Sequence, residues 1–281
     1  MLIIWKRLSN ALMASLKADA SQIAKYSPLE GWRHEGEEQC GMHINCCNAN
    51  GPRAFAMIPQ FAYQVQDDCV RVNFYAPSEA ELVLLGKKPV RLKQTTDYPQ
   101  TDQIEIEVDP AKETAFTIAL RIPAWSKIAV VSVNGQPQDG VLQGAYLPVN
   151  RKWKKGDRIT VKLDLRARLV ERNQAQAIVR GPVVLARDSR FGDGFVDEAS
   201  VVVSKDGYVE LTPVKAPGFA WLAFTAPMVL GTDLESNRAP KQIHFCDFAS
   251  AGNTWDKTQR YRVWLPKTLN VMHSPYRPYN Q

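Results

Sequence analysis

Over much of its length this chain alternates apolar and polar side chains with a period of two, and that pattern constrains its fold most strongly. The alternation is clearest in residues 70–75, 104–108, 116–122 and 159–165. A strand with this pattern buries one face and exposes the other, as in antiparallel sandwiches. Asn134-Gly135 and Gly156-Asp157 are typical of the turns between such strands. Residues 63–170 are therefore predicted to form an antiparallel β-sandwich.

A second stretch rich in strand-forming residues follows from Glu171 to the end of the chain. Residues 177–179 lead through Gly181-Pro182 into 183–185, and a further run covers 261–264. Asp206-Gly207 is another turn signal between them. We expect residues 171–281 to form a second antiparallel β-sandwich, which makes the chain mostly β.

The first 62 residues carry a different pattern. One apolar stripe recurs at three- and four-residue steps, which predicts a helix that ends before Pro28; its members are Leu2, Trp5, Leu8, Leu12 and Leu16. A second short helix is predicted from Gly51-Pro52, with Asn48 or Asn50 as its cap and a distortion at Pro59. Two short helices cannot enclose a core of their own. They must pack on the sandwich, on another chain, or on a helical domain that this chain lacks.

Composition excludes several classes of function. Lys and Arg exceed Asp and Glu by 35 to 29, for a net charge of +6, but the positive residues are scattered, so we predict no nucleic-acid partner. No apolar run approaches the roughly 20 residues of a membrane helix, so no membrane partner is expected. The five cysteines are odd in number and sparse over 281 residues, which argues against a disulfide framework. No phosphate-binding loop, GxSxG elbow or HExxH motif is present.

Reactive side chains are concentrated between His34 and Asn50, where two His, three Cys and three Glu fall within seventeen residues. Cys46 and Cys47 come just before the predicted helix start, whose free N–H groups favour a thiolate. A thiolate can act as a nucleophile or as a zinc ligand. Two sulfurs leave a tetrahedral site incomplete, and the cluster offers as further ligands Cys40, His43, His34 and Glu38. The alternative is an inert, buried cysteine pair.

Other aromatic and titratable residues are expected to be structural. The tryptophans of the β region could stack on sugars, but they are scattered and core packing is the stronger prediction; they are Trp125, Trp153, Trp221, Trp255 and Trp264. His244 and Cys246 alternate within an apolar segment, which predicts a core or edge strand.

At the cysteine cluster the sequence resembles glycoside hydrolase family 127, the β-L-arabinofuranosidase-like enzymes. The resemblance is strongest over the double-cysteine segment, 39–53, which is preceded by Tyr26-Ser27-Pro28-Leu29-Glu30-Gly31. Further matches are Arg121-Ile122-Pro123-Ala124-Trp125, Val133-Asn134-Gly135, residues 151–157, and Val179-Arg180-Gly181-Pro182. Together these motifs extend over nearly the whole chain.

The resemblance implies a fold and a site. The family carries an (α/α)₆ barrel with β-sandwich domains, so residues 1–62 would be the last helices of a truncated barrel. Cys46 would be the nucleophile of a retaining glycosidase and a zinc ligand, and Cys47 a second zinc ligand. His43 would lie near the sugar. The substrate would be an L-arabinofuranoside or a related plant-glycan sugar, and the cofactor zinc.

The resemblance also implies missing parts. The family's acid/base glutamate and its Glu-x-Cys zinc ligands lie on upstream barrel helices, so this chain would be a C-terminal fragment that is inactive alone. Glu38-Gln39-Cys40 spells Glu-x-Cys but lies only six residues before the cysteine pair. A separate chain carrying the missing barrel is a possible partner. The rival hypotheses are a non-catalytic carbohydrate-binding or scaffold β-sandwich protein and a purely structural zinc site.

Overall fold

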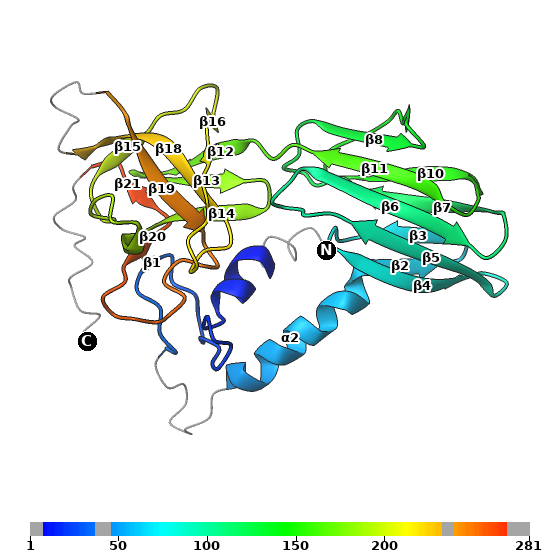
Figure 1. Ribbon diagram of the computed structural model, residues 1–281, viewed down its shortest axis with the longest axis horizontal. Helices are drawn as coiled ribbons and strands as arrows, with labels where there is room; N and C mark the ends of the chain where they lie inside the picture. Colours follow the sequence, from blue (N-terminus) through cyan, green and yellow to red (C-terminus); the bar gives the residue numbers. More distant parts are fainter. Residues whose placement is uncertain (1–7, 37–45, 232–238, 269–281) are drawn as a thin grey trace. The chain divides into compact units, whose positions relative to one another are not determined.

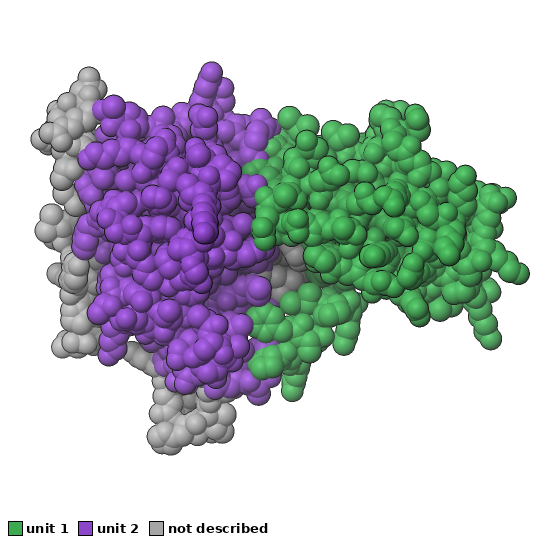
Figure 2. Space-filling view, in the orientation of Figure 1, with its two compact units in different colours: residues 1–2, 52–165 green, residues 3–51, 166–281 purple. Residues whose placement is uncertain are grey.

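The computed structural model describes residues 8–36, 46–231 and 239–268, and most of its elements are strands (Figure 1). The described residues divide into two compact units, with unit 1 formed by 52–165 and unit 2 by the rest (Figure 2). The prediction of a mostly β chain with few helices is confirmed. Within the described ranges, no helix is both long and apolar enough to cross a membrane.

Unit 1 is built from two sheets. The first has four strands in the order β10 (Tyr146–Trp153), β7 (Thr114–Arg121), β3 (Cys69–Val72) and β2 (Tyr63–Gln66). The second has six strands in the order β4 (Ser78–Leu84), β5 (Lys88–Thr95), β6 (Gln103–Pro110), β11 (Asp157–Leu163), β8 (Ala129–Val133) and β9 (Gln136–Pro137).

The period-two pattern of unit 1 corresponds to one buried face on each sheet. In β6, Ile104, Ile106 and Val108 are completely buried, while Glu105 and Glu107 between them are partly exposed. In the four-stranded sheet the same holds for apolar residues of β3, β7 and β10, which are Val70, Val72, Ile118, Leu120, Leu147 and Val149. This is the arrangement that antiparallel sandwich strands require.

One strand pair in unit 1 departs from the predicted antiparallel pairing. β3 lies beside β7 in parallel, with Val70 opposite Ile118 and Val72 opposite Leu120. Parallel neighbours need a long crossover connection. Here the chain between them forms β4, β5 and β6 of the other sheet, so the crossover is built from strands.

Unit 2 contains one branched sheet of eleven strands. Its main path runs β15 (Ser200–Val202), β18 (Ala223–Leu230), β19 (Lys241–Asp247), β14 (Val183–Asp188), β13 (Ala175–Arg180), β12 (Ala167–Arg172) and β16 (Tyr208–Val209). The side branches are β1 (Glu30–Gly31), β17 (Thr212–Pro213), β20 (Tyr261–Arg262) and β21 (Leu265–Pro266). The strand pairs of this sheet are antiparallel in the part of the chain that the structure describes, but the expected second sandwich is one continuous sheet rather than two separate ones.

Both faces of the central strands of this sheet are covered. Leu185 belongs to one buried apolar cluster and its neighbour Ala186 to another, and the same is true of Ile178 and Ala177. Cys246 is completely buried in β19, which lies between β18 and β14, so the prediction of a core position is confirmed. Strands covered on both faces lose the simple alternation of buried and exposed residues.

The N-terminal segment packs on this sheet. A short π-helical turn, η1 (Leu8–Leu12), is fixed by Asn10, whose amide nitrogen donates to the Pro182 carbonyl at 2.9 Å. The Asn10 oxygen accepts from the Val184 N–H at 2.8 Å. By Leu16 the chain has left the helix, because Leu16 pairs with Ile23 in an isolated antiparallel bridge. Leu2 and Trp5 of the predicted stripe lie outside the described residues.

Two further helical segments complete the described part of the chain: α2 (Cys46–Ala62) and the 3₁₀ turn η2 (Ser189–Phe191). The predicted domain boundaries at 62/63 and 170/171, and the origin of residues 1–62 in a helical barrel, stay predictions.

Candidate active site

The cysteine pair opens helix α2 rather than preceding it. The helix begins at Cys46, so the predicted start at Gly51-Pro52 is wrong, and both Pro52 and Pro59 lie within the helix. The Asn50 side chain donates to the Cys46 carbonyl at 3.0 Å. The first four N–H groups of a helix have no intrahelical acceptor, and those groups now belong to the turn that contains the cysteines.

The predicted capping roles of Asn48 and Asn50 are also wrong. The Asn48 side-chain oxygen accepts from the Ile23 N–H at 3.3 Å, and so ties the start of α2 to the segment before it. Gly51 packs against the same isoleucine. A Cβ at Gly51 would lie 2.1 Å from the Ile23 Cδ1 atom, which leaves no room for a side chain.

The two thiols are adjacent, form no disulfide and are separated by a distance that suits a shared metal ion. Cys46 is exposed and Cys47 is half-buried, and their sulfurs are 4.0 Å apart. A disulfide would need about 2.05 Å between sulfurs. Two sulfurs on one tetrahedral zinc, each about 2.3 Å from the metal, lie about 3.8 Å apart. The pair therefore fits half of a zinc site without rearrangement.

The electrostatics of the pair differ from the prediction at Cys47. Burial raises the pKa of this thiol, and the hydrogen bond and charge of Cys46 add to the increase. Lys25 acts in the opposite direction and favours the thiolate. Burial therefore shifts the pKa of Cys47 upward, opposite to the lowering expected for a thiol at a helix start.

The remaining predicted ligands are only partly described. Cys40, His43 and Glu38 lie outside the described residues. His34 is described, and its Nδ1 accepts from the Gly36 N–H at 3.0 Å while its Nε2 lies 3.5 Å from the Tyr26 hydroxyl oxygen. Across the ranges that the structure describes, no group of three or more His, Cys, Asp or Glu side chains could hold a metal ion. The structure thus brings together Cys46 and Cys47 alone.

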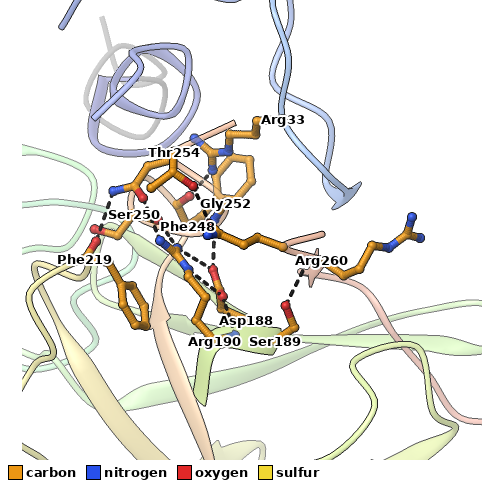
Figure 3. Close-up of polar contacts among 12 residues, drawn as sticks. Arg33, Asp188, Ser189, Arg190, Phe219, Phe248, Ser250, Gly252, Thr254 and Arg260 are labelled. Atoms are coloured by element: carbon orange, nitrogen blue, oxygen red, sulfur yellow. Dashed lines mark hydrogen bonds and ion pairs between the residues drawn. The ribbon is translucent and has the colours of Figure 1, made fainter. Parts of the chain in front are cut away.

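Sequence reasoning missed the residue that anchors the segment before the pair. Arg33 is 1% exposed, and its guanidinium carbon lies 4.7 Å from the ring centroid of Phe248 and 5.0 Å from that of Tyr261. It donates to the carbonyls of Ala14 and Phe248, and to that of Ala249 at 3.2 Å. Figure 3 shows Arg33 beside Phe248. An arginine in a polar loop gives no signal that its side chain will be buried.

A second buried polar network lies nearby in unit 2. Arg190 binds Asp188 through two hydrogen bonds, of 2.8 Å from Nε and 2.6 Å from Nη2 (Figure 3). The same carboxylate accepts from the Gly252 N–H at 2.9 Å, and Arg190 also donates to the Ser250 carbonyl at 2.9 Å. These contacts tie η2 to the loop after β19. Because Arg190 and Asp188 are paired with each other and with backbone groups, we interpret this network as structural.

Comparison with known proteins bears on unit 1 first. Residues 69–165 match the family model described as the beta-L-arabinofuranosidase GH127 middle domain. The match begins with β3 and ends at Leu165, where unit 1 ends. The chain carries a GH127 middle domain. The resemblance to this family is thereby confirmed, and the cysteine pair lies upstream of the matched GH127 residues.

Solved structures share the fold of the GH127-like chain over most of its length. One is a GH127 β-L-arabinofuranosidase from Geobacillus stearothermophilus T6, with 21% identity and a TM-score of 0.72 over 90% of this chain. Another, titled a glycoside hydrolase, has 22% identity and a TM-score of 0.75 over 94%. A further GH127 β-arabinofuranosidase has 22% identity and a TM-score of 0.76 over 95%. No curated protein sequence matches the chain significantly.

The chain is much shorter than these structures. It spans 44%, 48% and 45% of their respective lengths.

The tryptophans expected in the core differ in burial: Trp125 and Trp153 are buried in unit 1, whereas Trp221 is 45% exposed. Trp255 and Trp264 are half-buried, so the prediction of core packing is confirmed for Trp125 and Trp153 and is wrong for Trp221.

Proposed function

We propose that this chain is the C-terminal part of a retaining glycoside hydrolase that acts on L-arabinofuranosides or related plant-glycan sugars. Cys46 is the proposed nucleophile and a zinc ligand, and Cys47 is the second zinc ligand. One observation carries the proposal: two adjacent cysteines, with sulfurs 4.0 Å apart, open a helix in a chain that carries a GH127 middle domain. The role of His43 near the sugar is part of the same proposal.

The chemistry assigned to this chain is a double displacement. The Cys46 sulfur attacks the anomeric carbon, the bond to the leaving oxygen breaks, and that oxygen takes a proton from a general acid. Water then attacks the same carbon and gives its proton to the group that acted as the acid; the carbon–sulfur bond breaks with its electron pair on the Cys46 sulfur, and the sugar leaves with retained configuration. When bound, zinc holds both sulfurs as thiolates. The exposure of Cys46 leaves its sulfur accessible to a sugar.

The surface of α2 supports the proposal that a helical partner is required. Of its 17 residues only Gly51 is buried, although its sequence is largely apolar. Met57 and Phe61 are 39% and 42% exposed. Helices of globular proteins normally bury such side chains. We propose that the rest of an (α/α)₆ barrel, in the same or a separate chain, covers α2 and supplies the acid/base glutamate and remaining zinc ligands.

Metal analysis and thiol labelling test the site directly. With the barrel part supplied, we expect one zinc per chain, slow labelling of Cys46, and hydrolysis of arabinofuranosides. Cys46→Ser should lower turnover by several orders of magnitude and reduce zinc content. Cys69→Ser is the control, because Cys69 is also a cysteine without a disulfide, but it is half-buried and lies in unit 1. Wild-type turnover in Cys46→Ser would contradict the proposal.

The alternative function is a non-catalytic carbohydrate-binding or scaffold protein. It is favoured by the absence, among the residues that the structure describes, of a third metal-binding side chain near the cysteine pair. This alternative expects glycan affinity that is unchanged by Cys46→Ser and no hydrolysis with any added helical domain.

A further inference from the structure

Three aromatic side chains gather on the segment that precedes the cysteine pair. Tyr26 is 47% exposed and Trp32 is 36% exposed. His34 contacts both rings: its ring centroid lies 5.7 Å from that of Tyr26 and 6.0 Å from that of Trp32. We call Tyr26, Trp32 and His34 the aromatic platform. Partly exposed rings that touch each other on a surface are unusual for packing residues, which are normally buried.

Charged groups line one side of the aromatic platform. β1 pairs with β20 so that Glu30 faces Arg262, which places the next residue on the same face, Trp32, beside Arg260. The Arg260 guanidinium lies 5.5 Å from the Trp32 ring, and Arg262 binds the Glu30 carboxylate at 2.7 Å. The Glu30 side chain is half exposed. An aromatic surface beside planar, hydrogen-bonding charged groups suits a sugar, whose C–H face is apolar and whose rim carries hydroxyls.

The aromatic platform lies close to the cysteine pair within unit 2. The Ile23 N–H binds the side chain of Asn48, which follows directly after Cys47. Tyr26 is only three residues beyond Ile23, so their Cα atoms are at most about 10 Å apart. Lys25, between them, is near enough to Cys47 to affect its thiol electrostatically. These contacts place the start of the segment that carries the aromatic platform beside the first turn of α2.

From this arrangement we propose that the aromatic platform is a subsite for a second or third sugar unit of the substrate. The proposal rests on the proposed function and specifies its substrate class: oligosaccharides rather than single L-arabinofuranosides. The sugar at the cleavage point would lie at Cys46. The following units would extend over Tyr26 and Trp32, with Arg260 and Glu30 at the rim.

Binding of sugars of increasing length tests the subsite without any turnover. The probes are methyl L-arabinofuranoside and L-arabinofuranose oligomers of two to four units, titrated against the full chain by saturation-transfer NMR and tryptophan fluorescence. We expect affinity to rise with length. Trp32→Ala should weaken binding of the longer oligomers by about threefold to tenfold and remove the dependence on length, while Trp32→Phe keeps most of it.

Trp221→Ala is the matched control, since Trp221 is also an exposed tryptophan of unit 2. Equal losses in Trp32→Ala and Trp221→Ala, unchanged affinity in Trp32→Ala, or no binding of the longest oligomer would overturn the subsite. Such a failure leaves the metal content and thiol labelling of Cys46 untouched, so it is separable from failure of the proposed function. Length-dependent binding through Trp32 with no role for Cys46 would instead retain the subsite and remove the hydrolase.

Discussion

The two units of this protein differ in how much charge they bury. In unit 1 most ion pairs lie at the surface: Arg158, paired with Glu105 at 3.0 Å, has a side chain that is 58% exposed, and Asp157 is a buried exception at 2%. In unit 2 charged groups lie inside, where Arg33, Arg187 and Asp188 are each 1% exposed or less. A sandwich whose outer faces are wet can leave most of its charged groups in solvent, whereas a charged group inside unit 2 satisfies buried loop carbonyls, such as those of Ala14 and Phe248 bound by Arg33. The free energy of unfolding should therefore depend more strongly on the buried charged residues of unit 2 than on the surface ion pairs of unit 1.

The largest expected effect comes from Arg33. Arg33→Leu leaves three carbonyls without their donor, and loss of such a buried group costs about 3–5 kcal/mol. Hydrogen exchange followed by mass spectrometry should show faster exchange in β14 and β19 but unchanged protection in β6 and β11. Arg158→Ala in unit 1 is the matched arginine variant, and its free energy of unfolding should change by less than about 1 kcal/mol. Similar costs for the two variants would break the comparison.

An intermediate effect is expected where α2 meets unit 2. Gly51→Ala forces the new methyl group against Ile23, and overpacking of this kind typically costs about 1–3 kcal/mol. The double variant Gly51→Ala with Ile23→Val should recover part of that loss, because the valine lacks the Cδ1 atom in conflict. The midpoint of chemical denaturation measures both. Additive losses in the double variant would show that the two residues do not contact each other.

The smallest expected effect is on the pH dependence of stability, where one aspartate in each unit contributes with opposite sign. The hydrogen bond from Arg91 lowers the pKa of Asp109 in unit 1, so its stabilisation is present above the usual carboxyl range and is lost as pH falls through the lowered pKa. Burial raises the pKa of Asp247 in unit 2, so its ionisation costs stability as pH rises from the usual range through the raised pKa.

Carbon-detected NMR titration of the two carboxyl groups checks this difference. Asp109 should titrate below the ordinary range of aspartate and Asp247 above it. Arg91→Ala should move the Asp109 midpoint upward and leave that of Asp247 in place, because the two carboxyl groups have different causes for their shifts. Identical midpoints for the two groups would contradict the contrast between the units.

Prediction from sequence succeeded best in unit 1, where the strands predicted from alternation lie within the residues that match the GH127 family model. The alternation in residues 104–108 predicted β6 and its buried face, and the same residues lie within the family match. The positive φ angles of Asn134 and Gly135, 49° and 80°, are those that the Asn-Gly turn requires. The local pattern predicted these strands correctly because one face of each strand is exposed to solvent, so every second residue is apolar and buried.

The start of α2 shows where local signals misled. Pro52 suggested a first helical turn, yet the helix begins at Cys46. The contacts of Asn48 and Gly51 with Ile23, about 25 residues earlier in the chain, accompany that earlier start. Because such contacts join segments distant in sequence, no cap rule applied to residues 48–52 could anticipate them.

By itself, the sequence determined that this chain is mostly β, that its first module is a sandwich, and that its reactive residues gather around Cys46 and Cys47. Those features depend on periodicity, turn residues and composition, which are local. Tertiary structure alone decided the parallel pairing of β3 with β7, the burial of Arg33 against the rings of Phe248 and Tyr261, and the contact of Trp32 with Arg260. Each of these joins segments far apart in the chain, and only the folded backbone brings their side chains within contact distance.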